Sequence, residues 1–114
     1  MNIIQKVDFL TAIQELVESV HDNAVKKGFY VTPPEEGTAI ALMHSELSEA
    51  LDSARHGNPP SDHIPAFSGI EEELADVVIR IADWCGHKGY DLGGAILAKQ
   101  EFNAGRPHMH NKLF

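Results

Sequence analysis

Four carboxylates in two short motifs are the residues of this chain best suited to carry out chemistry. The segments ELSE (46–49) and ELAD (73–76) each place two acidic side chains three residues apart, which puts both on one face of a helix. Carboxylates that are buried together repel one another unless a cation is bound among them. Oxygen ligands favour a hard ion, Mg²⁺ or Mn²⁺, over zinc. The predicted metal ligands are Glu46, Glu49, Glu73 and Asp76.

The second motif lies in a segment that is apolar around most of a helix. In GIEEELADVVIRIADWCGHKG (69–89), charged side chains recur every three or four residues and form one narrow stripe. A helix on the protein surface normally has a broad polar face. We therefore interpret the stripe as facing inward, toward an ion site. Its members are Glu73, Asp76, Arg80, Asp83 and His87.

Other interpretations of these residues are open. A single E-x-x-E pair is usually part of a solvated helix face, although two such pairs on adjacent helices make that interpretation less favoured. Di-iron bundles use Glu-x-x-His pairs, and no His follows Glu46, Glu49 or Glu73 at that spacing. Asp83 and His87 have the i, i+4 spacing of a zinc-ligand pair, but such a pair is more often a simple hydrogen bond.

The C-terminal end of the chain carries cations instead. Lys99, Asn103 and Arg106 are spaced i, i+4 and i+7, so a helix would place them on one face. Lys and Arg bind triphosphates, and Asn can orient a phosphate or a water. The alternative is a solvated helix end, where the helix dipole favours cations. Residues 1–98 contain 6 Lys/Arg and 16 Asp/Glu (net −10), and residues 99–114 contain 3 and 1 (net +2).

Four helices are expected to position these residues, and the sequence contains no convincing strand. In a chain of 114 residues they predict one all-α domain, residues 1–114, built as a small four-helix bundle. The third helix has more apolar surface than three neighbours would cover, which predicts a homo-oligomer. The tail HMHNKLF (108–114) is expected to be extended. The helices are predicted from about Asn2 to Lys27, from Thr38 to Arg55, from Gly69 to between Gly86 and Gly89, and from the N-cap Asp91 into NAGRP (103–107).

Composition excludes some classes of partner. The net charge of −8 argues against nucleic-acid binding, which needs a positive surface. No apolar run approaches the roughly 20 residues of a membrane span. The N-terminal MNIIQKVDFL lacks the layout of a signal peptide, so we expect a cytoplasmic protein.

The order of the motifs resembles that of the MazG-like nucleoside triphosphate pyrophosphohydrolases, all-α enzymes with an E-x-x-E…E-x-x-D signature. ELSE, a gap of 23 residues, ELAD and the basic end carry the resemblance, which runs from about Met43 to Lys112. It implies Mg²⁺-dependent hydrolysis of the α–β phosphate bond of a (deoxy)nucleoside triphosphate to the monophosphate and pyrophosphate. It also implies a homodimer or homotetramer and a role in nucleotide-pool housekeeping. The rival function is a non-catalytic regulator that binds nucleotide or metal.

The resemblance also implies roles for individual residues. The four carboxylates would bind Mg²⁺, which would polarise the α-phosphate and activate a water. Glu46 or Glu49 would accept the proton of that water. The base would lie between helices near the metal, with Trp84 or Phe102 as candidates for stacking, although the spacing of both favours plain core packing. Lys99, Asn103 and Arg106 would bind the triphosphate, and Arg80, Asp83 and Lys112 would support the site.

Overall fold

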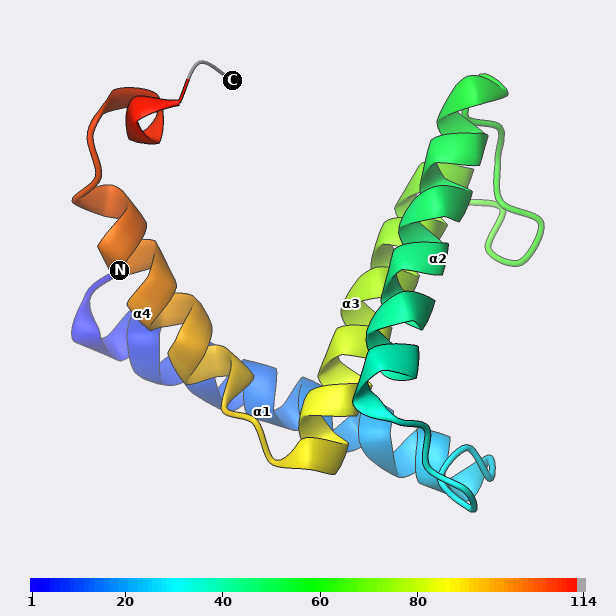
Figure 1. Ribbon diagram of the computed structural model, residues 1–114, viewed down its shortest axis with the longest axis horizontal. Helices are drawn as coiled ribbons and strands as arrows, with labels where there is room; N and C mark the ends of the chain where they lie inside the picture. The colour runs from blue at the N-terminus through cyan, green and yellow to red at the C-terminus, as the bar shows by residue number, and fades with distance from the viewer. Residues whose placement is uncertain (113–114) are drawn as a thin grey trace.

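The computed structural model describes residues 1–112 of the chain, which form four α-helices and one short 3₁₀ helix without a β-strand (Figure 1). This confirms the all-α prediction. Within these residues, none of the helices is both long enough and apolar enough to cross a membrane. The elements are α1 (Ile3–Lys26), α2 (Glu36–Arg55), α3 (Gly69–Lys88), α4 (Leu92–Ala104) and the 3₁₀ helix η1 (His108–Asn111).

The helices begin where side chains cap their free backbone N–H groups. Asn2 and Ser68 form capping boxes at the starts of α1 and α3, and the predicted N-cap Asp91 accepts a hydrogen bond from the Gly94 N–H. The second helix begins at Glu36, two residues before the predicted Thr38. The helix dipole favours an acidic residue in the first turn, which accounts for the earlier start.

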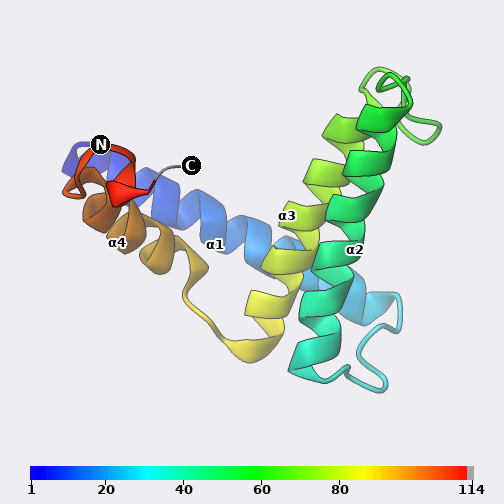
Figure 2. The same ribbon diagram turned by 45° about the horizontal axis from the view of Figure 1, so that its top comes forward.

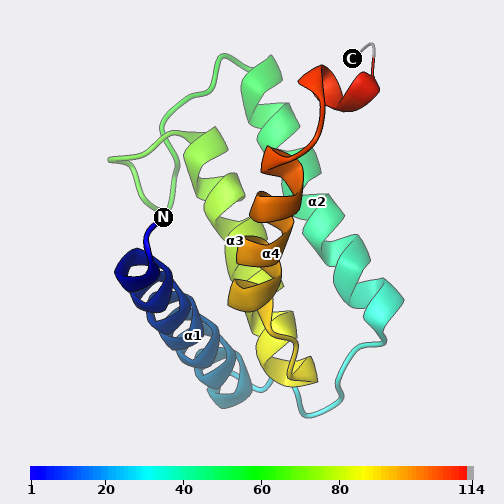
Figure 3. The same ribbon diagram turned by 90° about the vertical axis from the view of Figure 1, so that its left-hand side faces the viewer.

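The helices pack as two arms that meet on α1 (Figures 1 and 2). α2 and α3 run side by side in all three views (Figures 1–3) and form what we call the acidic arm, which holds both carboxylate motifs. α4 packs on the other part of α1 and, with the residues that follow to 112, forms the basic arm. The bundle is therefore open within one chain.

Two glycines allow both arms to approach α1 closely. A Cβ atom on Gly86 of α3 would lie 2.7 Å from the Cβ of His21, and one on Gly93 of α4 would lie 3.2 Å from a methyl group of Leu10. The first distance is too short for any residue except glycine without a shift of the backbone. α3 therefore crosses the C-terminal half of α1, and α4 packs on its N-terminal half.

The open arrangement leaves a small core and a large surface. The radius of gyration is 16.6 Å, against about 13 Å for a compact domain of this length. The accessible surface is 8374 Å², against about 6,200 Å² for a compact monomer of this mass. Among the described residues, no large side chain is fully buried. The buried apolar residues are Val17, Ala24, Ala39, Ala50, Ala82, Trp84 and Cys85.

The prediction of an extended tail was wrong for residues 108–111. Pro107, with φ −67°, leads into the 3₁₀ turn of η1, and the Lys112 N–H donates a hydrogen bond of 2.9 Å to the Met109 carbonyl. Such a turn depends on one or two local hydrogen bonds and has no periodic pattern that a sequence could reveal. Residues 113 and 114, the last of the predicted tail and domain, lie outside the described residues.

Candidate metal and nucleotide site

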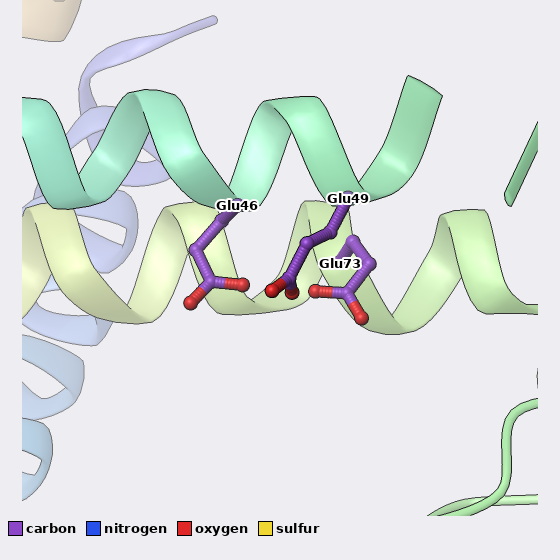
Figure 4. A group of neighbouring side chains, drawn as sticks. All are labelled: Glu46, Glu49 and Glu73. Atoms are coloured by element: carbon purple, nitrogen blue, oxygen red, sulfur yellow. The ribbon is translucent and has the colours of Figure 1, made fainter. Parts of the chain in front are cut away.

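The carboxylates of both motifs converge between α2 and α3. Glu46 and Glu49 project from α2 toward Glu73 of α3 (Figure 4), and an oxygen from each lies within 4.8 Å of the others. Asp76 and Glu72 form a second group of this kind with Glu73. Glu73 belongs to both groups, so the structure brings Glu46 and Glu49 to Glu73 and places Asp76 in the adjoining group.

Burial and mutual repulsion perturb these carboxyl groups. Burial, followed by interactions with Glu46 and Glu49, raises the pKa of Glu73 to about 8. Burial would also raise the pKa of Glu46, but hydrogen bonds, first of all from Arg80, lower it overall. The Arg80 Nε donates to Glu46 Oε1 at 2.8 Å. The charge of Arg80 thus offsets part of the repulsion within the group, and the raised pKa of Glu73 reflects the part that remains.

The donor set fits a hard divalent cation. The Oε2 atom of Glu73 is buried and has no hydrogen-bond partner within residues 1–112. A buried oxygen without a partner is costly, and a cation would satisfy it. Because every ligand on offer is a carboxylate oxygen, Mg²⁺ or Mn²⁺ fits the group better than zinc does.

Glu72 is the member of the site that the sequence did not reveal. Its carboxylate accepts hydrogen bonds from Ser61 Oγ (2.5 Å) and His63 Nδ1 (2.7 Å), which fasten the 57–68 loop to α3. Burial, followed by the charges of Glu46 and Glu72, raises the pKa of Asp76. The i, i+4 spacing of Glu72 and Asp76 was the available signal, because it places both side chains on one face of α3.

A cavity of about 750 Å³ opens beside the carboxylates, between α1, α2 and α3. This volume is in the range of small-molecule sites in proteins. Its lining includes Glu46 and follows α3 for about 12 Å, from Asp76 and Arg80 to Asp83 and Trp84. One end of the cavity therefore adjoins the candidate metal site.

The other end of the cavity is aromatic. The Asp83 carboxylate pairs with Nδ1 of His21 on α1 at 2.9 Å, and not with the His87 that its spacing suggested. The ring of His87 instead lies against Tyr30 and Trp84, at centroid distances of 4.5 and 5.2 Å. His21 precedes Asp83 by 62 residues, so no local pattern could have predicted the pair.

The predicted phosphate-binding residues lie elsewhere. Lys99 and Arg106 flank the exposed ring of Phe102, at 4.5 and 5.6 Å from its centroid. Asn103 and Lys112 are exposed. All of them belong to the basic arm, which extends away from the acidic arm (Figures 1 and 2). Within one chain, the structure does not bring these residues to the carboxylates.

The surroundings of the two candidate stacking residues differ accordingly. Trp84 lines the cavity, where its Nε1 donates to Glu36 at 3.1 Å, whereas Phe102 lies on the basic arm. Trp84, and not Phe102, therefore lines the cavity that adjoins the carboxylates.

Comparisons of the chain with protein-family models, with curated proteins and with solved structures found no match.

Proposed function

We propose that the protein is a Mg²⁺-dependent nucleoside triphosphate pyrophosphohydrolase, which cleaves the α–β phosphate bond to release the monophosphate and pyrophosphate. One observation carries the proposal. Glu73 belongs to two groups of three carboxylates beside a cavity that could take a nucleotide, and its buried Oε2 atom has no partner among residues 1–112. The resemblance of the ELSE and ELAD motifs to the MazG-like signature supports the same reaction.

Within this proposal the acidic arm has two roles. Glu46, Glu49, Glu73 and Asp76 would hold the cation. When bound there, Mg²⁺ would supply the charge that polarises a phosphoryl group and lowers the pKa of a water. Glu49 is the better placed of the two candidate bases, because it is exposed while Glu46 is buried and held by Arg80. Glu49 would thus accept the proton of the attacking water.

We further propose a homodimer, or a homotetramer built from it, in which the basic arm of one chain reaches the acidic arm of another. The accessible surface exceeds that of a compact monomer by about 2,200 Å², comparable with what one chain buries in an obligate dimer. Both helices of the acidic arm also expose large apolar side chains, Leu47, Leu51, Leu74 and Val78, at 45–52%. Opposite charges on the two arms would orient the partners.

The reaction is tested by incubating the protein with Mg²⁺ and a panel of standard and modified nucleoside triphosphates, followed by chromatography of the products. Monophosphate and pyrophosphate are expected, and chelation of the metal should stop their formation. Diphosphate and phosphate would mean that a different bond is cut, which would contradict the proposal. A folded sample that binds Mg²⁺ and turns over no triphosphate would favour the regulator instead.

A further inference from the structure

The aromatic end of the cavity is built around a fixed hydrogen-bond acceptor, the carboxylate of Asp83. A carboxylate accepts hydrogen bonds and donates none, so the Nδ1 atom of His21, 2.9 Å from Asp83 Oδ1, carries the proton of this pair. The hydroxyl of Tyr30 also interacts with Asp83, and burial together with this interaction raises the Tyr30 pKa. The hydrogen bond with His21 fixes the position of the Asp83 carboxylate.

The walls at this end suit a flat ring. Tyr30 and Trp84 both line the cavity, and each is held by other side chains. The Trp84 Nε1 donates to Glu36, and the Tyr30 ring packs edge-on against His21 at 4.7 Å. The ring of His87 lies against both Tyr30 and Trp84, so these rings form one fixed aromatic wall of the cavity, against which a planar, apolar ring can pack.

The spacing of residues along α3 sets the distance between this aromatic wall and the carboxylates. Asp83 lies seven residues beyond Asp76, about 10 Å along the helix axis, and both line the same cavity. A single ligand could therefore place phosphates near Asp76 and a planar base near Asp83. Because a carboxylate only accepts hydrogen bonds, a ligand that bonds to Asp83 must donate one.

Resting on the proposed function, we propose that Asp83 makes the enzyme select nucleobases that carry an exocyclic amino group. Cytosine and adenine present an amino group that donates to a carboxylate, whereas uracil and hypoxanthine present a carbonyl oxygen in its place. The neighbouring ring N–H offers no substitute at that position, because it lies between two carbonyl oxygens in uracil and next to one in hypoxanthine, and the carboxylate would repel the oxygen that replaces the amino group. A carbonyl oxygen placed against the carboxylate gains no hydrogen bond and is repelled, which discriminates against the analogue that lacks the amino group.

The proposal is tested with two matched pairs of substrates, dCTP against dUTP and dATP against dITP, in the presence of Mg²⁺. We expect kcat/KM to favour the amino base of each pair by about 10- to 100-fold. In the Asp83→Asn variant, whose amide both donates and accepts, the ratios should fall to within about threefold of one. Asp52→Asn, which changes a carboxylate that is 74% exposed on α2, should retain the wild-type ratios.

Two outcomes would overturn the role of Asp83. One is a wild-type enzyme that shows no preference within either pair, a result that needs no variant to fold. The other is a folded Asp83→Asn variant, checked by circular dichroism, with unchanged ratios.

Binding of monophosphates separates this role from the proposed reaction. Trp84 is the only tryptophan of the chain, so its fluorescence can report titration with dCMP and dUMP without metal or turnover. Suppose that the protein hydrolyses no triphosphate but binds dCMP selectively, and that Asp83→Asn loses this selectivity. That result would support the role of Asp83 and contradict the proposed hydrolase activity. Hydrolysis of dCTP and dUTP at equal rates would support the hydrolase activity and contradict the role of Asp83.

Discussion

The two arms of the molecule differ in charge: the predicted metal ligands lie on the acidic arm and the predicted phosphate-binding residues on the basic arm. On the acidic arm, Glu46, Glu49 and Glu73 lie close together, and the Oε2 atom of Glu73 is buried without a partner in the described chain. The basic arm spreads Lys99 and Arg106 around an exposed aromatic ring. The first has negative charge in excess and the second has cations facing solvent. In our proposal, a bound cation would offset the negative charge of the acidic arm, and a second chain would bring the cations of its basic arm to it.

The arms also differ in how they are fastened. On the acidic arm, Glu36 at the start of α2 accepts hydrogen bonds from Trp84 of α3 (3.1 Å) and from Tyr90 just beyond it (2.6 Å). α4 of the basic arm is only 13 residues long and packs on α1. The acidic arm is thus held together by hydrogen bonds between its own helices, whereas the position of the basic arm depends on the packing of α4 on α1.

The largest expected effect concerns the acidic arm. Glu73→Gln removes the carboxylate shared by both groups, and we expect it to lower kcat/KM by about 100-fold or more, the scale for a group that stabilises transition-state charge. The matched control is Glu71→Gln, an exposed residue two positions away that can keep its capping box as glutamine. Steady-state assays should show near wild-type activity in that control, and a fully active Glu73→Gln variant would remove the metal site from the proposal.

A smaller effect is expected on the basic arm. Arg106→Ala should lower kcat/KM by about 10- to 100-fold, because charge-assisted hydrogen bonds to phosphate are lost. It should leave Mg²⁺ binding, measured by calorimetry without nucleotide, unchanged. Arg55→Ala, at the end of α2, serves as the control. Equal losses in both arginine variants would point to net charge and not to a specific contact.

A further test concerns the surface that would join the arms of two chains. Val78→Asp replaces an apolar side chain that is 52% exposed with a charged one. We expect the dissociation constant of the dimer to rise by about tenfold or more. Analytical ultracentrifugation measures this directly. Val31→Asp, on the loop before α2 and 86% exposed, is the control. A wild-type chain that is monomeric at all concentrations tested would contradict the dimer itself.

The smallest expected effect is on stability. A carboxyl group with a higher pKa in the folded chain binds more protons when folded, so Glu73 makes the free energy of unfolding decrease as pH rises from about 4.5 to about 8. Without metal, the melting temperature of wild type relative to Glu73→Gln should fall as pH rises through this range. Calorimetry with Mg²⁺ present should show a smaller fall. An identical pH profile for both proteins would mean that folding does not raise the pKa of Glu73.

The sequence predicted the parts of this structure that depend on local patterns. The helix bounds followed from apolar periodicity, the Asp91 cap from residue type, and the convergence of the carboxylates from their three-residue spacing. The direction of the two arms did not follow, because it depends on how closely Gly86 and Gly93 approach α1. The pairing of Asp83 with a residue of α1 likewise required the tertiary structure.

The most direct test of the proposed shared site is to mix two variants that each have low activity. Glu73→Gln supplies an intact basic arm, and Arg106→Ala supplies an intact acidic arm. If the site combines arms from two chains, a heterodimer contains one wild-type site, and an equal mixture should recover about a quarter of wild-type activity. Recovery no greater than the sum of the separate variants, in a mixture shown by mass spectrometry to exchange subunits, would contradict the shared site.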